Sequence, residues 1–197
     1  MRFKLLGTEI YISFLFAAVI TLMLACDRTG LVLPTLFAVF VHEIGHLFAM
    51  WLLECGPKRI KLIPTSMQIT APITKRYRND ILIALFGPLV NFLFTLIFYL
   101  NFMLFKNELS FYYAGLNLII GLFNSLPVSG LDGGTVLYSV ISKKTNPNRA
   151  AVIMKFITFG VASILTATAI ILTLKGSFNV SLYIIGIYLF VMAVTCK

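Results

Sequence analysis

The chain has 197 residues, of which 59% are hydrophobic and only 12% are charged. Soluble domains carry about 25% charged residues, so this composition excludes a soluble enzyme and predicts a single-domain polytopic membrane protein. The net charge of +9 does not indicate a nucleic-acid partner, because the basic residues follow the membrane topology described below. The cysteines lack C-x-x-C spacing and are expected to be free thiols. They are Cys26, Cys55 and Cys196.

The apolar runs predict an all-α fold with about six transmembrane helices. The N-terminal run is followed by no small-residue cleavage site, so we expect it to be retained as the first span. The predicted spans cover residues 10–26, 31–54, 81–105, 111–141, 150–174 and 179–195.

A small membrane-associated β-hairpin or sheet is predicted near residues 4–12 and 58–72. The first segment alternates partly between polar and apolar residues, and could be a strand that leads into the membrane. The second is rich in Ile and Thr, is interrupted by two prolines and is too short and polar to span a bilayer. A basic loop that touches lipid headgroups explains the second segment about as well.

The fourth predicted span is interrupted at residues 124–134. Pro127 and three glycines fall within eight residues there, which is incompatible with a continuous helix. Irregular backbone at membrane depth is tolerated only where it is buried in protein or lines a wet cavity. The interruption therefore predicts an interior site.

Lys and Arg are distributed very unevenly between the two sides of the predicted topology. Six spans place thirteen of the sixteen basic residues on the side of both termini and three on the other. The positive-inside rule then predicts a multi-pass protein of the cell membrane with cytoplasmic N- and C-termini. The basic side is also expected to face anionic lipids.

The only two histidines of the chain, His42 and His46, lie four residues apart in the second span. Positions i and i+4 of a helix share one face. With Glu43 between them they form the H-E-x-x-H pattern, in which two histidines bind zinc and the glutamate acts as general base. Ionisable groups in a bilayer are costly and therefore indicate function.

A catalytic zinc needs a third protein ligand. Of the seven acidic residues, most lie at span ends, and Asp132 is the remaining deep carboxylate. Helical rise places His46 and Asp132 about 15–18 Å inside the same face of the membrane. Asp132 could instead cap the helix that resumes after the interruption. Asn124 could merely hydrogen-bond to backbone groups that the interruption leaves without helical partners.

Three motifs resemble the site-2 protease family of intramembrane zinc metalloproteases. Residues 42–46 match its H-E-x-G-H, residues 124–134 match its N-x-x-P-x-x-x-L-D-G-G, and residues 87–91 are similar to its G-P-x-x-N. The resemblance implies one zinc ion held by two histidines and the aspartate, with the glutamate as catalytic residue. It also implies supporting or substrate-binding roles for Asn91, Asn124, Pro127 and Gly133.

Within that family, the layout is most similar to the sporulation branch, without its CBS-type domain. The resemblance implies a transmembrane protein substrate, such as a sigma-factor precursor or an anti-sigma factor, and a membrane regulatory partner. It gives no oligomeric state. Two other functions remain open from the residues: a membrane metal-ion transporter, whose path His and Asp could line, and a catalytically inactive membrane binding protein.

Overall fold

The computed structural model describes residues 2–5, 8–56, 59–63, 66–70, 77–176 and 178–195. Apolar runs form seven helices in these residues, and four short segments form strands. The chain divides into two units, Met1–Phe123 and Asn124–Lys197. The first contains β1 (Arg2–Leu5), β2 (Thr8–Ile12), α1 (Phe14–Cys26), α2 (Val32–Leu52), β3 (Arg59–Ile63), β4 (Ser66–Thr70), α3 (Tyr77–Phe105) and all but the last residue of α4 (Glu108–Asn124). The second contains α5 (Asp132–Lys144), α6 (Pro147–Leu174) and α7 (Val180–Thr195).

The four strands form one mixed sheet in the order β1-β2-β3-β4. β1 pairs with β2, and β3 with β4, as antiparallel hairpins, whereas β2 and β3 run parallel in a register that matches Ile10 with Ile60. The parallel pairing is possible because α1 and α2 form the crossover between β2 and β3. The predicted prolines of the second hairpin, at residues 64 and 72, lie outside the described residues.

The predicted fold class needs one correction. About six transmembrane helices are not found: among the described residues only α2, α3 and α6 are long and apolar enough to cross a membrane. α1 and α7 have 13 and 16 residues, or about 20 and 24 Å at 1.5 Å per residue. The β-structure expected near residues 4–12 and 58–72 is present, as two hairpins that form one four-stranded sheet.

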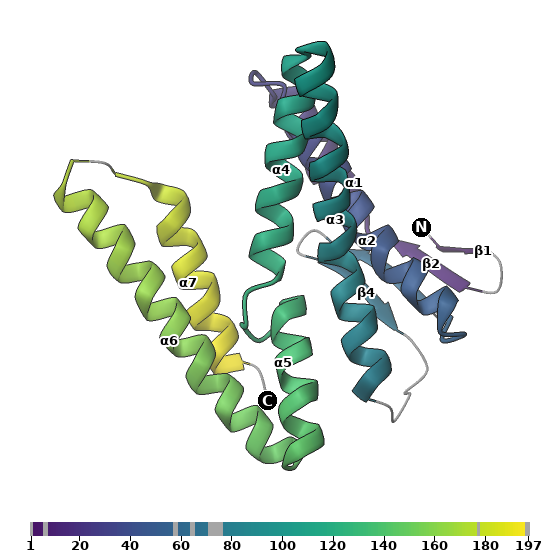
Figure 1. Ribbon diagram of the computed structural model, residues 1–197, viewed down its shortest axis with the longest axis vertical. Helices are drawn as coiled ribbons and strands as arrows, with labels where there is room; N and C mark the ends of the chain where they lie inside the picture. The colour runs from purple at the N-terminus through teal and green to yellow at the C-terminus, as the bar shows by residue number, and fades with distance from the viewer. Residues whose placement is uncertain are drawn as a thin grey trace. The chain divides into compact units, whose positions relative to one another are not determined.

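Small residues let α2 and α3 of the first unit approach closely. Ala38, Ala49 and Ala84 are almost completely buried there, as expected for helices that associate in lipid by close backbone packing. Rings of Phe37, Phe94, Phe98 and Tyr113 join α2, α3 and α4 through edge and stacked contacts. Figure 1 shows α3 and α4 side by side and antiparallel.

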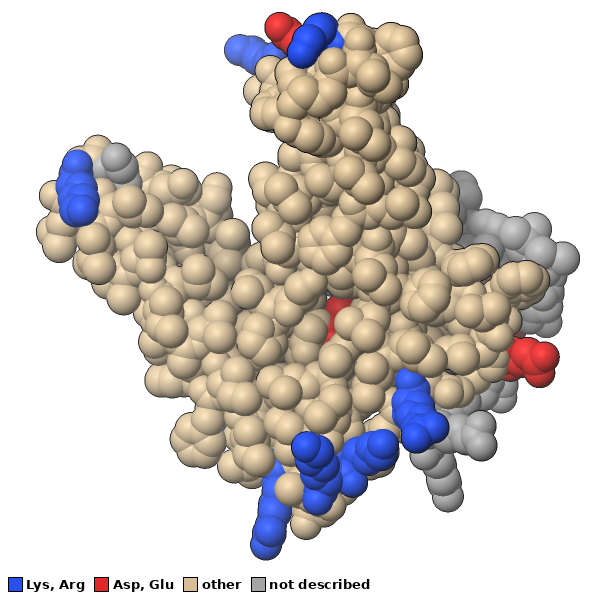
Figure 2. All heavy atoms as spheres, viewed as in Figure 1, with Lys and Arg blue, Asp and Glu red and all other residues tan. Residues whose placement is uncertain are grey.

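In the second unit, α6 and α7 pack as an antiparallel pair (Figure 1). Ala150, Ala162 and Ala169 of α6 are buried, as is Leu189 of α7. Exposed cationic residues, including Lys143, Lys144 and Arg149, gather over the α5–α6 turn, where Figure 2 shows blue spheres against a largely tan surface.

Large apolar side chains face outward along the helices of both units. Phe14 is 87% exposed, and Leu104 and Phe156 are each 75% exposed. Such extensive apolar exposure is not stable in water. Together with the three long apolar helices, it marks the chain as a membrane protein.

Candidate metal centre

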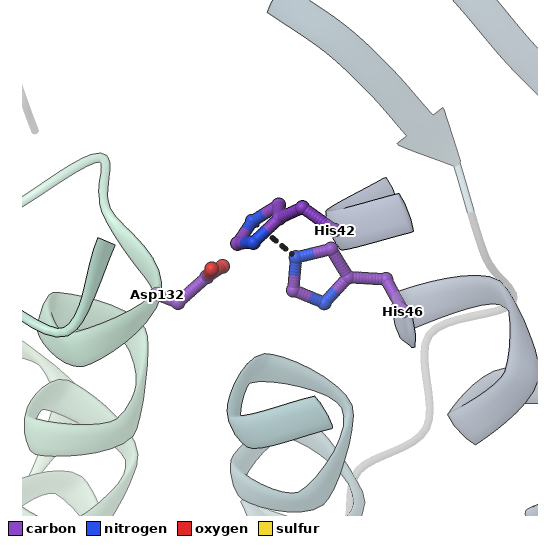
Figure 3. Close-up of side chains that lie close together, drawn as sticks. All are labelled: His42, His46 and Asp132. Atoms are coloured by element: carbon purple, nitrogen blue, oxygen red, sulfur yellow. Dashed lines mark hydrogen bonds between the residues drawn. The ribbon is translucent and has the colours of Figure 1, made fainter. Parts of the chain in front are cut away.

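The two histidines lie on the buried face of α2, as helical spacing requires. His42 is 6% exposed and His46 is 8% exposed. Their Nε2 atoms are 3.1 Å apart, and the rings meet edge to face, 88° apart in plane. Figure 3 shows this contact, together with the side chain of Asp132.

The other nitrogen of each ring is held by an acceptor on α3. His42 Nδ1 donates to Asn91 Oδ1 at 2.6 Å, and His46 Nδ1 donates to the backbone carbonyl of Ile83 at 2.8 Å. When Nδ1 of a neutral imidazole carries the proton, Nε2 carries the lone pair. Both lone pairs therefore point toward the same small region.

This donor arrangement fits a metal ion. A plain hydrogen bond between the two Nε2 atoms would require one ring to carry both protons as an imidazolium, whereas a metal ion accepts both lone pairs. At Zn–N distances of about 2.0–2.1 Å, tetrahedral geometry separates two ligand nitrogens by about 3.3 Å. The observed separation of 3.1 Å is close to that value.

Two glycines are required where α3 passes the imidazoles. A Cβ on Gly87 would lie 2.5 Å from His46 Nε2 and 2.8 Å from His42 Cε1. A Cβ on Gly45 would lie 2.6 Å from the carbonyl oxygen of Phe86. Both distances are too short for a Cβ atom. Gly45 therefore lets the α3 backbone approach α2, and Gly87 lets it approach the two rings.

Pro88 lies inside α3, next to this close approach. Proline has no N–H and crowds the carbonyl four residues earlier, which loosens the helix locally. The affected carbonyl belongs to Ala84 and is adjacent to that of Ile83, which accepts the His46 bond. Gly87 thus leaves room for the rings, and Pro88 leaves the carbonyl of Ala84 without its usual helical N–H donor.

Glu43 follows His42 on α2 and is half-buried. One helical residue turns the side chain by about 100°, so the glutamate does not share the face of the two imidazoles. This position is compatible with a base that acts beside a metal rather than as its ligand.

Asp132 is the first residue of α5 in the second unit and is half-buried. The N-cap residue is Leu131, whose side chain makes no capping hydrogen bond, and Asp132 is the first residue inside the helix. Gly133 and Gly134 follow it, and a Cβ on either would collide with the backbone of residues 125–129, so the preceding loop folds tightly against the start of α5.

That loop is fastened to α6. The backbone N–H of Ser129 donates to Thr158 Oγ1 at 2.9 Å, and the Thr158 hydroxyl donates to Ser129 Oγ at 3.1 Å. Thr158 is completely buried, so the loop that leads to Asp132 is hydrogen-bonded to a buried side chain of α6.

Within the first unit the structure thus brings together His42, His46 and Asn91. Asn124 ends α4 and, like Pro127, Asp132 and Gly133, belongs to the second unit. Sequence reasoning missed Asn117 of α4, whose Oδ1 accepts a hydrogen bond from Asn91 Nδ2 at 3.0 Å. An amide in the middle of an apolar helix was the signal that could have identified it.

The fold, with its mixed sheet and a buried histidine pair on a long apolar helix, is similar to that of a solved site-2 protease. A site-2 protease from Methanocaldococcus jannaschii matches the structure with a TM-score of 0.72 over 100% of this chain and 94% of that one, at 23% identity. The predicted resemblance is therefore confirmed at the level of the fold.

A zinc metalloprotease of Methanocaldococcus jannaschii is similar in sequence. It is 26% identical over 202 residues, which cover 96% of this chain and 57% of that protein. The chain thus spans little more than half the length of this relative. No family model matches the chain.

Proposed function

We propose that the chain is a zinc-dependent intramembrane endopeptidase, which hydrolyses a peptide bond in or near the transmembrane segment of a membrane-tethered protein. One observation carries the proposal: two buried imidazoles have both Nδ1 protons committed to acceptors and their Nε2 atoms 3.1 Å apart. The similarity to a zinc metalloprotease supports the same chemistry.

His42, His46 and Asp132 are the proposed zinc ligands. Each offers one ligand atom of a kind that zinc accepts, two imidazole nitrogens and a carboxylate oxygen. Three protein ligands leave one coordination position open, as in catalytic rather than structural zinc sites. Zinc, when bound, supplies a Lewis acid that polarises a carbonyl and makes water acidic near neutral pH.

Glu43 is the proposed catalytic residue. It takes the proton of the attacking water and then passes it to the leaving amine. Its position on α2, one residue after His42, keeps the carboxylate next to the reaction without occupying the imidazole face. Asn124, Pro127 and Gly133 are proposed to support the loop or the substrate around this centre.

The substrate must present an extended segment to such a site. A transmembrane helix hides its amides in internal hydrogen bonds, so substrates with helix-weakening residues near the cut are expected. β4 lies at one end of the strand order. We propose that this edge holds the unwound segment as an added strand.

The proposed orientation follows from topology and charge, whereas the proposed partners follow from the resemblance to the site-2 protease family. Both termini are proposed to be cytoplasmic, and the cationic residues of the α5–α6 turn to face anionic lipids. A sigma-factor precursor or an anti-sigma factor, and a membrane regulatory partner, are the proposed interaction partners.

The test uses Glu43→Gln, co-expressed with a candidate tethered substrate. The proposal expects this variant to retain zinc and lose cleavage, because the base is removed but the ligands remain. Glu54→Gln is the matched control: it makes the same change at an exposed residue just after α2 and should cut normally. Equal cleavage by wild type and Glu43→Gln would reject the proposal, and metal-dependent uptake without cleavage would favour transport instead.

A further inference from the structure

Two asparagine side chains, Asn91 on α3 and Asn117 on α4, are completely buried in the helical part of the first unit. Burying an amide without hydrogen-bond partners costs several kcal/mol in an apolar medium. Both amides are paired, and their bonds form one chain that ends at His42.

The direction of every bond in this chain is fixed by backbone carbonyls, which can only accept. Asn117 Nδ2 donates to the carbonyl of Tyr113 at 2.8 Å, so Asn117 Oδ1 faces Asn91. Asn91 Nδ2 donates both to Asn117 Oδ1 at 3.0 Å and to the carbonyl of Ala38 at 2.8 Å. The oxygen of Asn91 is left to face His42.

We propose that Asn91 and Asn117 are positioning residues, which lock His42 in the tautomer that carries its proton on Nδ1 and offers Nε2 to the metal. This inference rests on the metal site of the proposed function. If the Asn91 amide were reversed, Nδ2 would face His42 Nδ1 and require an acceptor there. The proton would then move to Nε2 and block coordination.

The two ligands differ in how they are held. His46 donates directly to the backbone of Ile83, so no side-chain substitution removes its acceptor. His42 depends on a side-chain amide that a second amide orients. Substitutions in the network should therefore alter the His42 ring and leave the His46 ring unchanged.

The experiment uses ¹⁵N-histidine labelling of the full chain in detergent micelles, combined with zinc titration against a competing chelator. The chain has only two histidines, so the ring nitrogens of each can be assigned. The variants are Asn91→Leu and Asn117→Leu. The matched control is Asn101→Leu, because Asn101 of α3 also bonds α4, accepting from Ser110 Oγ at 2.8 Å, but is remote from the histidine pair in sequence and in hydrogen bonding.

Both rings of the metal-free wild type should show a protonated Nδ1 and an unprotonated Nε2. Asn91→Leu should add an Nε2–H form of His42 alone and weaken zinc binding about 10- to 100-fold, the usual effect of losing a partner of a metal-bound histidine. Asn117→Leu keeps the bond to Ala38, so it should fold and show a smaller change of the same kind. Asn101→Leu should match the wild type in both readouts.

An unchanged His42 tautomer and unchanged zinc affinity in both network variants would overturn the inference while leaving the proposed protease intact. Conversely, a tautomer shift and weaker zinc binding in a chain that cuts no substrate would keep the inference and reject the protease. Equal loss of zinc in the Asn101→Leu control would also overturn it, because the effect would then reflect α3–α4 packing in general.

Discussion

Gly87→Ala adds one methyl group where α3 touches the two imidazoles. The new Cβ would lie 2.5 Å from both Cε1 and Nε2 of His46 and 2.8 Å from Cε1 of His42. The atoms in the way belong to the rings themselves, so the substitution acts directly on the proposed ligands.

The required movement exceeds what a metal site tolerates. Ordinary contacts begin at 3.4 Å, so the rings or α3 must shift by about 0.9 Å, whereas metal–ligand distances hold within about 0.2 Å. Overpacking a core costs about 1–3 kcal/mol. Gly87→Ala should therefore fold less stably and bind zinc at least tenfold more weakly.

The assay is zinc affinity by competition with a chelator, together with thermal unfolding, both in detergent. Gly115→Ala is the matched control, because it makes the same change in a helix of the same unit with nothing within 4 Å of the new Cβ. It should bind zinc normally and gain up to about 1 kcal/mol from helix propensity. Wild-type zinc affinity in Gly87→Ala would refute the reasoning that places the metal at this pair of rings.

Chelation of the wild type should lower its unfolding temperature, and added zinc should restore it, because a ligand that binds only the folded state stabilises it; an unchanged midpoint would argue against a bound metal. Thr158→Val should destabilise the chain by about 1–3 kcal/mol, since it leaves the part-buried N–H of Ser129 without its acceptor, and thermal unfolding measures this. Desolvation raises the pKa of Asp27, but hydrogen bonds from Val32 and Thr29 outweigh it and hold the pKa below its ordinary 3.8. The ionised carboxylate therefore stabilises the fold above the ordinary pKa, and this stabilisation is lost as the pH falls through the lowered pKa of the folded state. Asp27→Asn should flatten the acid limb of a stability–pH curve, and an unaltered curve would contradict this.

Local periodicity was sufficient to place the histidine pair. Positions four apart on a helix must share a face, so the approach of His42 to His46 was predictable from spacing alone. Their partners were not, because the contacts of Asn91 with His42 and Asn117 depend on how α3 packs against α2 and α4. No spacing along the chain encodes that packing.

The same limit explains the errors in the fold. Residues 10–12 fit both the first predicted span and the strand predicted near residues 4–12. In the structure Ile10–Ile12 are part of β2, where pairing with β1 and β3 decides their conformation. Hydropathy measures how apolar a run is. It does not show that the first residues of a run pair in a sheet, so it overestimated the length of the first helix.

The most direct test of the central claim is the zinc K-edge absorption spectrum of the purified wild-type chain. The account predicts one zinc per chain, with two imidazole nitrogens at about 2.0–2.1 Å and a carboxylate oxygen at about 2.0–2.2 Å, and loss of the metal in Asp132→Ala. A thiolate sulfur at about 2.3 Å, or a spectrum that is unchanged in Asp132→Ala, would contradict it.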